Sequence, residues 1–221
     1  MLLNLEFEIL VLLIPALILS LCVHEFSHGI TAYYYGDDTA YLNGRLTLNP
    51  LKHLDPAGTL MLLFIGFGYA KPVPVNPNNL NNPRKDIVVV AAAGPISNIL
   101  LAFLGLFTLY TLFYVNKELL NVSVQTFLQI FIQINIYLAL FNLIPLYPLD
   151  GGQIFGNMLS KKYPHFNYNL HVYGPKILLG VILIGLLSGF SIIGLILNPL
   201  YQIVYNILDF IVNLFYSILL W

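Results

Sequence analysis

The chain has 221 residues, of which 58% are hydrophobic and only 9% are charged, whereas an ordinary soluble domain is roughly 25% charged. Its mean hydropathy is +0.81 and its formal net charge is −1. These values exclude a soluble globular protein and give no reason to expect a nucleic-acid partner. The single cysteine, Cys22, excludes an internal disulfide and a thiolate-rich metal site.

The first apolar run, from about Ile9 to Tyr35, is long enough to cross a bilayer, since roughly 20 helical residues span the hydrocarbon. It ends in three tyrosines, which suit a membrane interface, and Gly36-Asp37-Asp38 then supplies the exit into water. The residues before it lack the basic region and small-residue cleavage site of a signal peptide. We therefore expect a retained transmembrane helix that ends near Gly36.

The stretch from Asp37 to Asp86 is rich in Asn, Pro and Gly and predicts turns and extended backbone. It contains one apolar piece, Gly58 to Gly68, about half the length that a span needs. This piece is predicted to be re-entrant or interfacial. The extended stretch that follows, Gly68 to Pro77, could pair with an unwound substrate as an added strand, or could be a simple loop.

Three further apolar runs follow: Ile87 to Val115, Val124 to Leu146, and Ile177 to Trp221. The last is long enough for two spans, with a break expected at Asn198-Pro199, and the connection Phe155 to Pro175 reads as polar. The fold class is therefore an all-α polytopic membrane protein with about five transmembrane helices and a re-entrant or extended segment between the first two. We expect one membrane-embedded domain, 1–221, with a catalytic core at about 9–155 and additional C-terminal helices at 177–221.

Basic residues in short loops predict the orientation. If the N-terminus is outside, only Lys117 faces out, and the remaining basic residues of the loops face the cytoplasm: Arg45, Lys52, Lys71, Arg84, Lys85, Lys161, Lys162 and Lys176. This partition holds only if Gly58 to Gly68 does not cross. The expected localisation is a multi-pass protein of the cell membrane.

The first helix contains the sequence H-E-F-S-H, with His24, Glu25 and His28. At ~100° per residue, the two histidines lie on one face, one turn apart, close enough to bind one metal ion. Glu25 lies near enough to act on a water at that ion without becoming a ligand. Ionisable groups are costly inside a membrane and usually mark a functional site, although interhelical hydrogen bonding is the simpler alternative.

A catalytic zinc ion commonly takes three protein ligands, so a third must come from elsewhere in the chain. Asp150 follows the run that ends at Leu146, and the predicted topology brings it to the same side of the membrane as His28. An ordinary helix end followed by a turn is the alternative for Asp150 alone. The surrounding prolines and glycines were expected to prevent a regular helix there and to leave the backbone lining a cavity.

Three motifs together resemble the site-2 protease family of intramembrane zinc metalloproteases. They are HEFSH, AAAGPISN at Ala91 to Asn98, and NLIPLYPLDGGQ at Asn142 to Gln153. The stretches GRLTLNPLKHLDPAGTL and GYAKPVPVNP are also similar to members with a compact membrane core, without PDZ-like or cystathionine-synthase-type extensions. The resemblance covers roughly Cys22 to Gln153.

The resemblance implies one catalytic Zn²⁺ held by His24, His28 and Asp150, with Glu25 as the base and Asn142 and Asn98 helping to form the site. Asn142 is the better candidate for donating a hydrogen bond to the oxyanion, and Asn98 for bracing helices. The implied activity is hydrolysis of peptide bonds in or near transmembrane segments, as in regulated intramembrane proteolysis. The implied partners are a transmembrane protein substrate and the lipid bilayer.

Other functions use similar residues. A cation or proton transporter or channel could employ His24, Glu25, His28 and Asp150 without hydrolysis. A protease of the CAAX-processing type shares the H-E-x-x-H pattern but needs a glutamate as third ligand, and no glutamate follows Glu118. The remaining histidines, among them His53, are expected to be solvated or interfacial. The sequence gives no oligomeric state.

Overall fold

The computed structural model describes residues 6–65, 68, 70–160 and 162–219, and within them it is helical without a β-strand. Three short helices are α2 (Thr39–Leu42), α3 (Pro56–Ile65) and α6 (Asp150–Leu159). Five helices are long and apolar enough to cross a membrane: α1 (Phe7–Tyr34), α4 (Pro83–Val115), α5 (Val122–Asn142), α7 (Pro164–Ser188) and α8 (Ile192–Leu219). The prediction of an all-α polytopic membrane protein with about five spans is confirmed.

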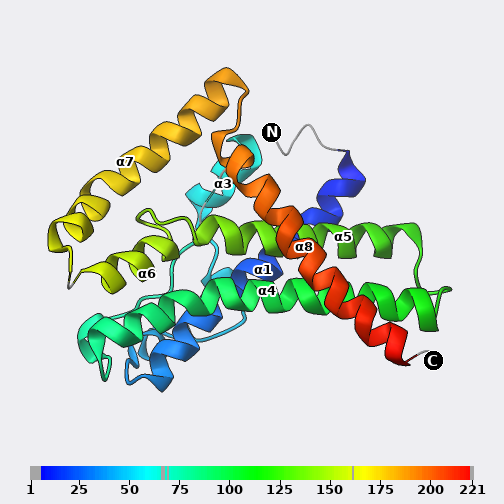
Figure 1. The fold of residues 1–221 in the computed structure, drawn as a ribbon, viewed down its shortest axis with the longest axis horizontal. Coiled ribbons are helices and arrows are strands. Elements are labelled where there is room, and N and C mark those ends of the chain that lie inside the picture. Colours follow the sequence, from blue (N-terminus) through cyan, green and yellow to red (C-terminus); the bar gives the residue numbers. More distant parts are fainter. Residues whose placement is uncertain (1–5, 66–67, 69, 161, 220–221) are drawn as a thin grey trace.

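Helix α4 is the centre of the arrangement and packs against α1, α5, α6 and α8. Figure 1 shows α4 and α5 side by side, with α8 crossing them obliquely and α7 standing away from this pair. Helix α7 packs instead against α6 and α8. The molecule therefore has a packed unit of α1, α4, α5 and α6, to which α7 and α8 form an outer arm.

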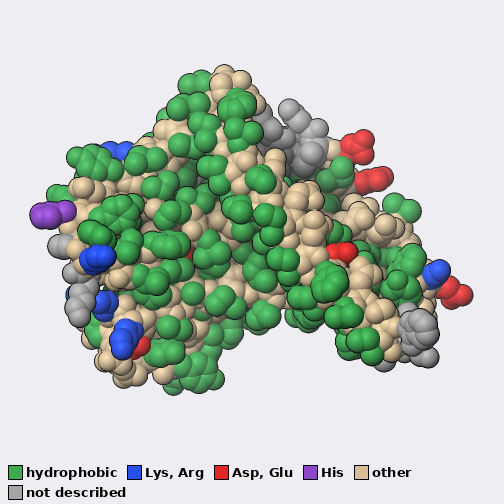
Figure 2. Space-filling model, in the orientation of Figure 1, with side chains coloured by type: hydrophobic (Ala, Val, Ile, Leu, Met, Phe, Trp, Pro, Cys, Tyr) green, Lys and Arg blue, Asp and Glu red, His purple; other side chains and the backbone are tan. Residues whose placement is uncertain are grey.

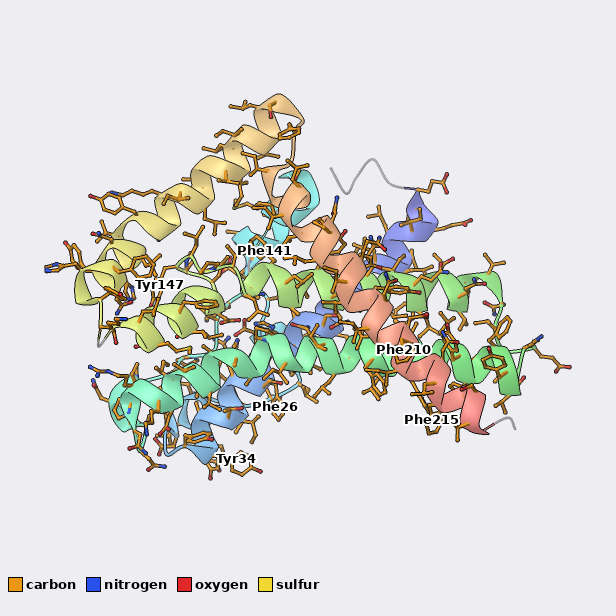
Figure 3. The ribbon with its side chains drawn as sticks, viewed as in Figure 1. Phe26, Tyr34, Phe141, Tyr147, Phe210 and Phe215 are labelled. Atoms are coloured by element: carbon orange, nitrogen blue, oxygen red, sulfur yellow. The ribbon has the colours of Figure 1, made fainter. Side chains whose placement is uncertain are left out.

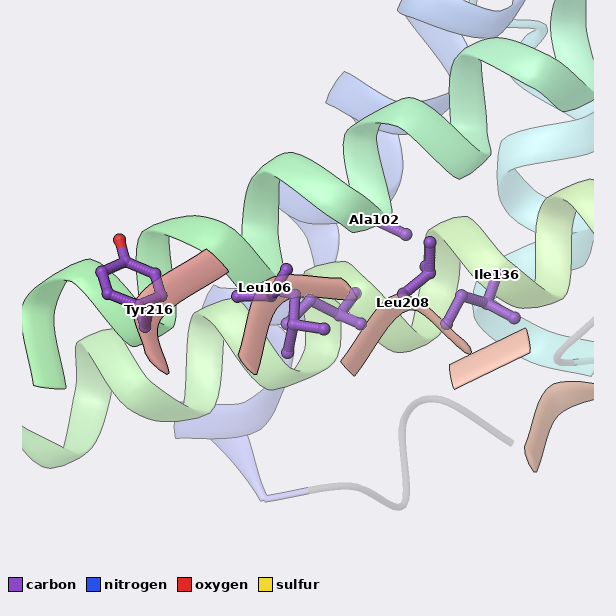
Figure 4. Packing of buried hydrophobic residues seen from close by; sticks show 7 residues of the cluster. Ala102, Leu106, Ile136, Leu208 and Tyr216 are labelled. Atoms are coloured by element: carbon purple, nitrogen blue, oxygen red, sulfur yellow. The ribbon is translucent and has the colours of Figure 1, made fainter. Parts of the chain in front are cut away.

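One buried cluster joins α4, α5 and α8, and its members interlock along the crossing (Figure 4). It consists of Ala102, Leu106, Ile132, Ile136, Leu208, Val212 and Tyr216. Between membrane helices such contacts stabilise through close packing, because lipid tails are as apolar as the side chains. Small residues at the crossing let the backbones approach, and Ala102 is fully buried there.

The segment between α1 and α4 turns back over the end of α1. Gly36 takes a positive φ of 101°, which ends the helix and favours glycine. Asp37 then accepts hydrogen bonds from the backbone of Asn76 and the amide of Asn79, at 2.7 and 3.0 Å. Burial alone would raise the pKa of Asp37, but these bonds and those from Thr39 hold it below its ordinary value. Asp37 thereby ties the two ends of the segment together.

The apolar piece expected to be re-entrant forms α3, whose 10 residues are half of a span. Of the predicted stretch, residues 66 and 67 lie outside the described part. An isolated antiparallel bridge joins Leu54 to Ala70, and the Lys71 amide donates to the His53 carbonyl at 2.8 Å. The chain beyond Lys71 is extended as far as a 3-10 turn, η3 (Pro77–Asn79). The non-spanning, partly extended connection is therefore present as predicted.

Lysine and arginine side chains gather toward one end of the molecule in Figure 2, where α1 ends and α4 begins. Apolar side chains cover most of the remaining visible face. Such a surface suits lipid rather than water. With its five apolar helices, this is a multi-pass membrane protein.

Two expectations about the C-terminal part were wrong. Helix α8 continues through Pro199, and the break lies at Gly189, whose φ of 69° ends α7, followed by Ser191, which accepts from the Gly194 amide at 2.9 Å. Membrane helices tolerate an internal proline because neighbouring groups satisfy the freed backbone carbonyl. The first C-terminal helix, expected from Ile177, already begins at Pro164, so most of the polar connection Phe155 to Pro175 is helical.

Candidate metal centre

His24 and His28 lie one turn apart on α1 and turn their rings toward α4 and the start of α6. Their Nε2 atoms are 3.0 Å apart, and the ring planes meet at 84°. Both rings are held through Nδ1: that of His28 donates to the Val90 carbonyl at 2.7 Å, and that of His24 lies 2.6 Å from Asn98 Oδ1. Since these partners are oxygen acceptors, both Nδ1 atoms carry the hydrogen, which leaves the lone pair of each neutral ring on Nε2.

Asp150 completes the group as the first residue of α6. Its Oδ2 lies 3.2 Å from His24 Nε2, and its Oδ1 lies 3.4 Å from His28 Nε2. The three ligand atoms lie within 4.8 Å of one another. Oδ2 is buried and accepts no hydrogen bond from the described residues. Two lone pairs and a carboxylate repel each other at such distances, so this donor set fits a cation such as Zn²⁺, which prefers imidazole nitrogen and carboxylate oxygen.

Two glycines explain how Asp150 reaches the histidines. A Cβ on Gly151 would lie 2.3 Å from the Leu143 carbonyl oxygen, and one on Gly152 would lie 2.5 Å from the Tyr147 nitrogen. The start of α6 therefore packs directly against the irregular stretch 143–149 that follows α5. The expectation that no regular helix forms at Asp150 was wrong, because the irregular backbone ends one residue earlier.

Gly94 forms the wall of the site on α4. A Cβ there would lie 2.5 Å from Nε2 of both His24 and His28. The backbone of α4 can reach the two nitrogen atoms only because no side chain intervenes. Gly94 stands in the Ala91 to Asn98 motif, but the sequence alone did not indicate this contact.

Glu25 sits beside the histidines and meets the extended segment. The Val73 amide donates to Glu25 Oε2 at 2.8 Å. Arg45, which is buried, holds the same segment by donating Nη2 to the carbonyls of Lys71 and Pro72, at 2.7 and 3.2 Å. One carboxylate oxygen of Glu25 is thus fixed by backbone. The roles of Val73 and Arg45 were not predicted.

Asn98 and Asn142, the two asparagines predicted to help form the site, differ in their contacts. Asn98 contacts His24 directly and also bonds to Asn135 on α5, whose Oδ1 accepts from Asn98 Nδ2 at 2.8 Å. Asn142 is partly buried at the end of α5 and donates Nδ2 to the Leu138 carbonyl at 3.0 Å. In the described part of the chain, no hydrogen bond joins Asn142 to His24, His28 or Asp150.

His53 was expected to be solvated or interfacial, and it is not solvated. It is 1% exposed, and its Nε2 lies 2.6 Å from the Thr47 carbonyl oxygen. His171 stacks on Tyr147, with ring centroids 3.5 Å apart, where the stretch after α5 meets α7. Figure 3 labels this tyrosine between α6 and α7. His53 therefore belongs to the packed interior, whereas His171 is exposed apart from its contact with Tyr147.

Five apolar helices, together with an imidazole-imidazole-carboxylate centre that has a glutamate beside it, define a membrane metallohydrolase. The family model that matches residues 12–183 is that of Peptidase family M50, and the chain belongs to this family. It is a zinc metalloprotease. The transporter or channel alternative is thereby set aside.

The curated relatives carry consistent names. The chain is 47% identical over 150 residues to "Putative zinc metalloprotease YwhC" of Bacillus subtilis. The aligned region covers 66% of this chain and 68% of that protein. It is 33% identical over 151 residues to "Putative zinc metalloprotease Rip2" of Mycobacterium tuberculosis, covering 65% of this chain and 55% of that protein. It is 35% identical over 101 residues to Rip2 of Mycolicibacterium smegmatis, covering 43% and 39%. No solved structure matches the chain.

Proposed function

We propose that this zinc metalloprotease cleaves peptide bonds in or near transmembrane segments of membrane-protein substrates, with zinc held by His24, His28 and Asp150. The observation that carries the proposal is the convergence of two imidazole nitrogens and one carboxylate within 4.8 Å, with Glu25 next to them on α1. When bound, the zinc supplies an activated water and polarises the scissile carbonyl. Three ligands leave a position open, as catalytic zinc requires.

Glu25 acts as general base and then as general acid. With Oε2 anchored on the Val73 amide, Oε1 accepts the proton of the attacking water as its oxygen bonds to the carbonyl carbon. The same proton then passes to the peptide nitrogen as the carbon–nitrogen bond breaks. The products are one carboxylic acid and one amine, which become carboxylate and ammonium as the remaining proton of the water passes between them, and Glu25 returns to its starting state.

Asn142 is proposed to donate a hydrogen bond to the oxyanion with the second hydrogen of its Nδ2, since the first is donated to the Leu138 carbonyl. A substrate helix must also unwind before its backbone can reach the site, because its peptide groups are bonded to one another. The extended segment from Lys71 to Asn76 lies beside Glu25, where it can offer backbone partners to the unwound chain.

The proposed placement is the cell membrane, with the N-terminus outside and the site toward the cytoplasm, since most basic residues lie at the end where α1 terminates. Residues 1–221 would form one protease domain, with its catalytic core at about 9–155. Single cysteines at Arg84 and Lys117, introduced in Cys22→Ser, test this in intact cells. An impermeant thiol reagent should label position 117 alone, and labelling of position 84 alone would reverse the orientation.

The central test compares wild type, Glu25→Gln and Glu118→Gln, purified in detergent. Zinc content is measured together with cleavage of a model transmembrane substrate. Glu25→Gln is expected to keep its zinc and lose about 10³-fold in cleavage rate, because the amide cannot take up a proton. Glu118→Gln, in the exposed loop after α4, should match wild type in both. Equal cleavage by wild type and Glu25→Gln would refute the proposal.

A further inference from the structure

Three fully buried polar side chains connect α1, α4 and α5 behind His24. They are Ser20, Asn98 and Asn135, each 0% exposed. Asn135 lies in the middle of α5, far from either end of that helix, and does not touch the ligand atoms. Buried amides in membrane helices require partners for both their oxygen and their nitrogen, so each bond can be followed from one residue to the next.

The orientation of the Asn135 amide is fixed by groups that can only accept. Its Nδ2 donates to the Phe131 carbonyl and to Ser20 Oγ, both at 2.8 Å. Ser20 gives its own hydroxyl hydrogen to the Ala16 carbonyl at 2.7 Å, so it must accept from Asn135. The Asn135 oxygen consequently faces α4.

Asn98 must therefore direct its amide nitrogen, the donor, toward that oxygen. Its Nδ2 donates to Asn135 Oδ1 at 2.8 Å and to the Ser20 carbonyl at 3.3 Å. Its own oxygen is thereby turned toward His24 Nδ1, 2.6 Å away. Because this oxygen can only accept, Nδ1 of His24 must carry the ring hydrogen. The lone pair of the ring is then on Nε2, the atom that faces Asp150.

We infer that Asn135 is a positioning residue for the zinc site: it sets the direction of the Asn98 amide and, through it, keeps the hydrogen of His24 on Nδ1. Without Asn135, the Asn98 nitrogen keeps only its longer bond to the Ser20 carbonyl, at 3.3 Å, so a half-turn of the amide that presents this nitrogen to the ring costs one bond fewer. The hydrogen of His24 would then move to Nε2 and occupy the ligand position. This inference rests on the proposed ligand set, because it assumes that His24 Nε2 binds the metal.

The first test measures zinc affinity by competition with a chelator. Asn135→Leu, of similar volume, is expected to bind zinc about tenfold more weakly, as when a group behind a metal-binding histidine is removed. Asn213→Leu on α8 is the matched control, since it removes a partly buried amide that bonds Tyr110 and Asp209 away from the site. It should bind zinc as wild type does. Equal losses in both variants would overturn the inference.

A milder variant, Ser20→Ala, tests whether the direction of the Asn135 amide controls zinc affinity. Ser20→Ala removes one acceptor of Asn135 but leaves the Phe131 carbonyl, which alone still fixes the amide. Its zinc affinity should fall by less than about threefold, below the loss that removal of a whole supporting group brings. A larger loss in Ser20→Ala than in Asn135→Leu would contradict the order of the bonds.

The second test observes the ring itself in the metal-free protein, so it does not depend on activity. Nitrogen NMR of ¹⁵N-histidine-labelled protein distinguishes a ring with its hydrogen on Nδ1 from one with it on Nε2, and His24→Gln assigns the signal. Wild type should carry the hydrogen on Nδ1, and Asn135→Leu should show a population on Nε2. An Nε2 hydrogen in wild type, or no change in Asn135→Leu, overturns the inference. Retention of zinc by His24→Gln would instead overturn the proposed ligand set.

Discussion

The packed unit of α1, α4, α5 and α6 and the arm of α7 and α8 use buried polar residues differently. In the packed unit, the bonds from Asn135 through Asn98 end on a ring nitrogen of the metal centre. Where the arm meets the packed unit, Tyr110 of α4 donates to Asp209 of α8 at 2.7 Å, and these bonds join helices without reaching the metal centre. The two regions also differ in burial: 44% of the apolar membrane-spanning stretch of α4 is buried, whereas only 11% of the corresponding stretch of α7 is buried. Similar residues therefore position a reactive group in one region and fasten helices in the other.

The strongest test of this division is Gly94→Ala. The added Cβ would lie 2.5 Å from Nε2 of both histidines, so at least one ring must leave its place. Zinc affinity should fall by about 100-fold or more, at the upper limit of what supporting groups contribute. Gly180→Ala on α7, where a Cβ meets nothing within 4 Å, should leave zinc affinity unchanged when both are titrated against a chelator.

Arg45→Met tests whether the extended segment serves the reaction. Losing the bonds to the Lys71 and Pro72 carbonyls frees the backbone that anchors Glu25. The cleavage rate should fall about tenfold, because small displacements of a catalytic group are costly, while zinc content stays constant. Lys176→Met in the arm is the control for the lost charge. Equal cleavage by Arg45→Met and wild type would show that the segment does not position Glu25.

Asp37→Asn should have a smaller effect, on stability. The substitution weakens the bonds from Asn76 and Asn79, at a cost of about 1.5–3 kcal/mol for hydrogen bonds to a charged group. Because the pKa of Asp37 is lowered in the folded state, its stabilisation is complete above the ordinary value of 3.8 and is lost as the pH falls below it. Thermal unfolding in detergent at several pH values should therefore show wild type approaching the variant only in acid.

The smallest effect is expected for Asn213→Leu in the arm. Hydrogen bonds between membrane helices contribute about 0.6 kcal/mol on average, and Tyr110 keeps its bond to Asp209 in this variant. Thermal stability should decrease slightly, with cleavage and zinc content unchanged. A loss of zinc in this variant would mean that the arm and the metal centre are coupled, which would remove the division between the two regions.

The sequence predicted the elements that have one strong local signal. Spanning length identified the five apolar helices, and the one-turn spacing of His24 and His28 placed both on one face, as the structure has them. The predictions from the sequence were wrong where tertiary contacts determine where a helix begins or ends. Pro199 reads as a break, yet α8 runs through it, while Gly189 ends α7 by its left-handed conformation.

The residues that the sequence did not indicate act at long range. Asn135 is one of several side-chain amides on α5, and nothing local distinguishes it from Gln129 or Gln133. Its importance follows from tertiary contacts, because Asn98 is 74 positions from His24 in the chain and Asn135 is 37 positions from Asn98. Gly94 was visible as part of a motif, but its contact with two ring nitrogens follows from how closely α4 approaches α1. His53 is buried by the bridge at Leu54 and Ala70, which no local pattern signals.

The contact between Val73 and Glu25 has a consequence for mutational scanning. Val73 stands between Pro72 and Pro74, neither of which has an amide hydrogen, so it is the sole backbone donor of that tripeptide. Alanine at position 73 would keep the donor, so a scan of side chains would report on the packing of the buried Val73 side chain and not on this bond. Only an ester linkage or a third proline would delete the bond, so the partner of Glu25, the proposed base, escapes most mutational scans.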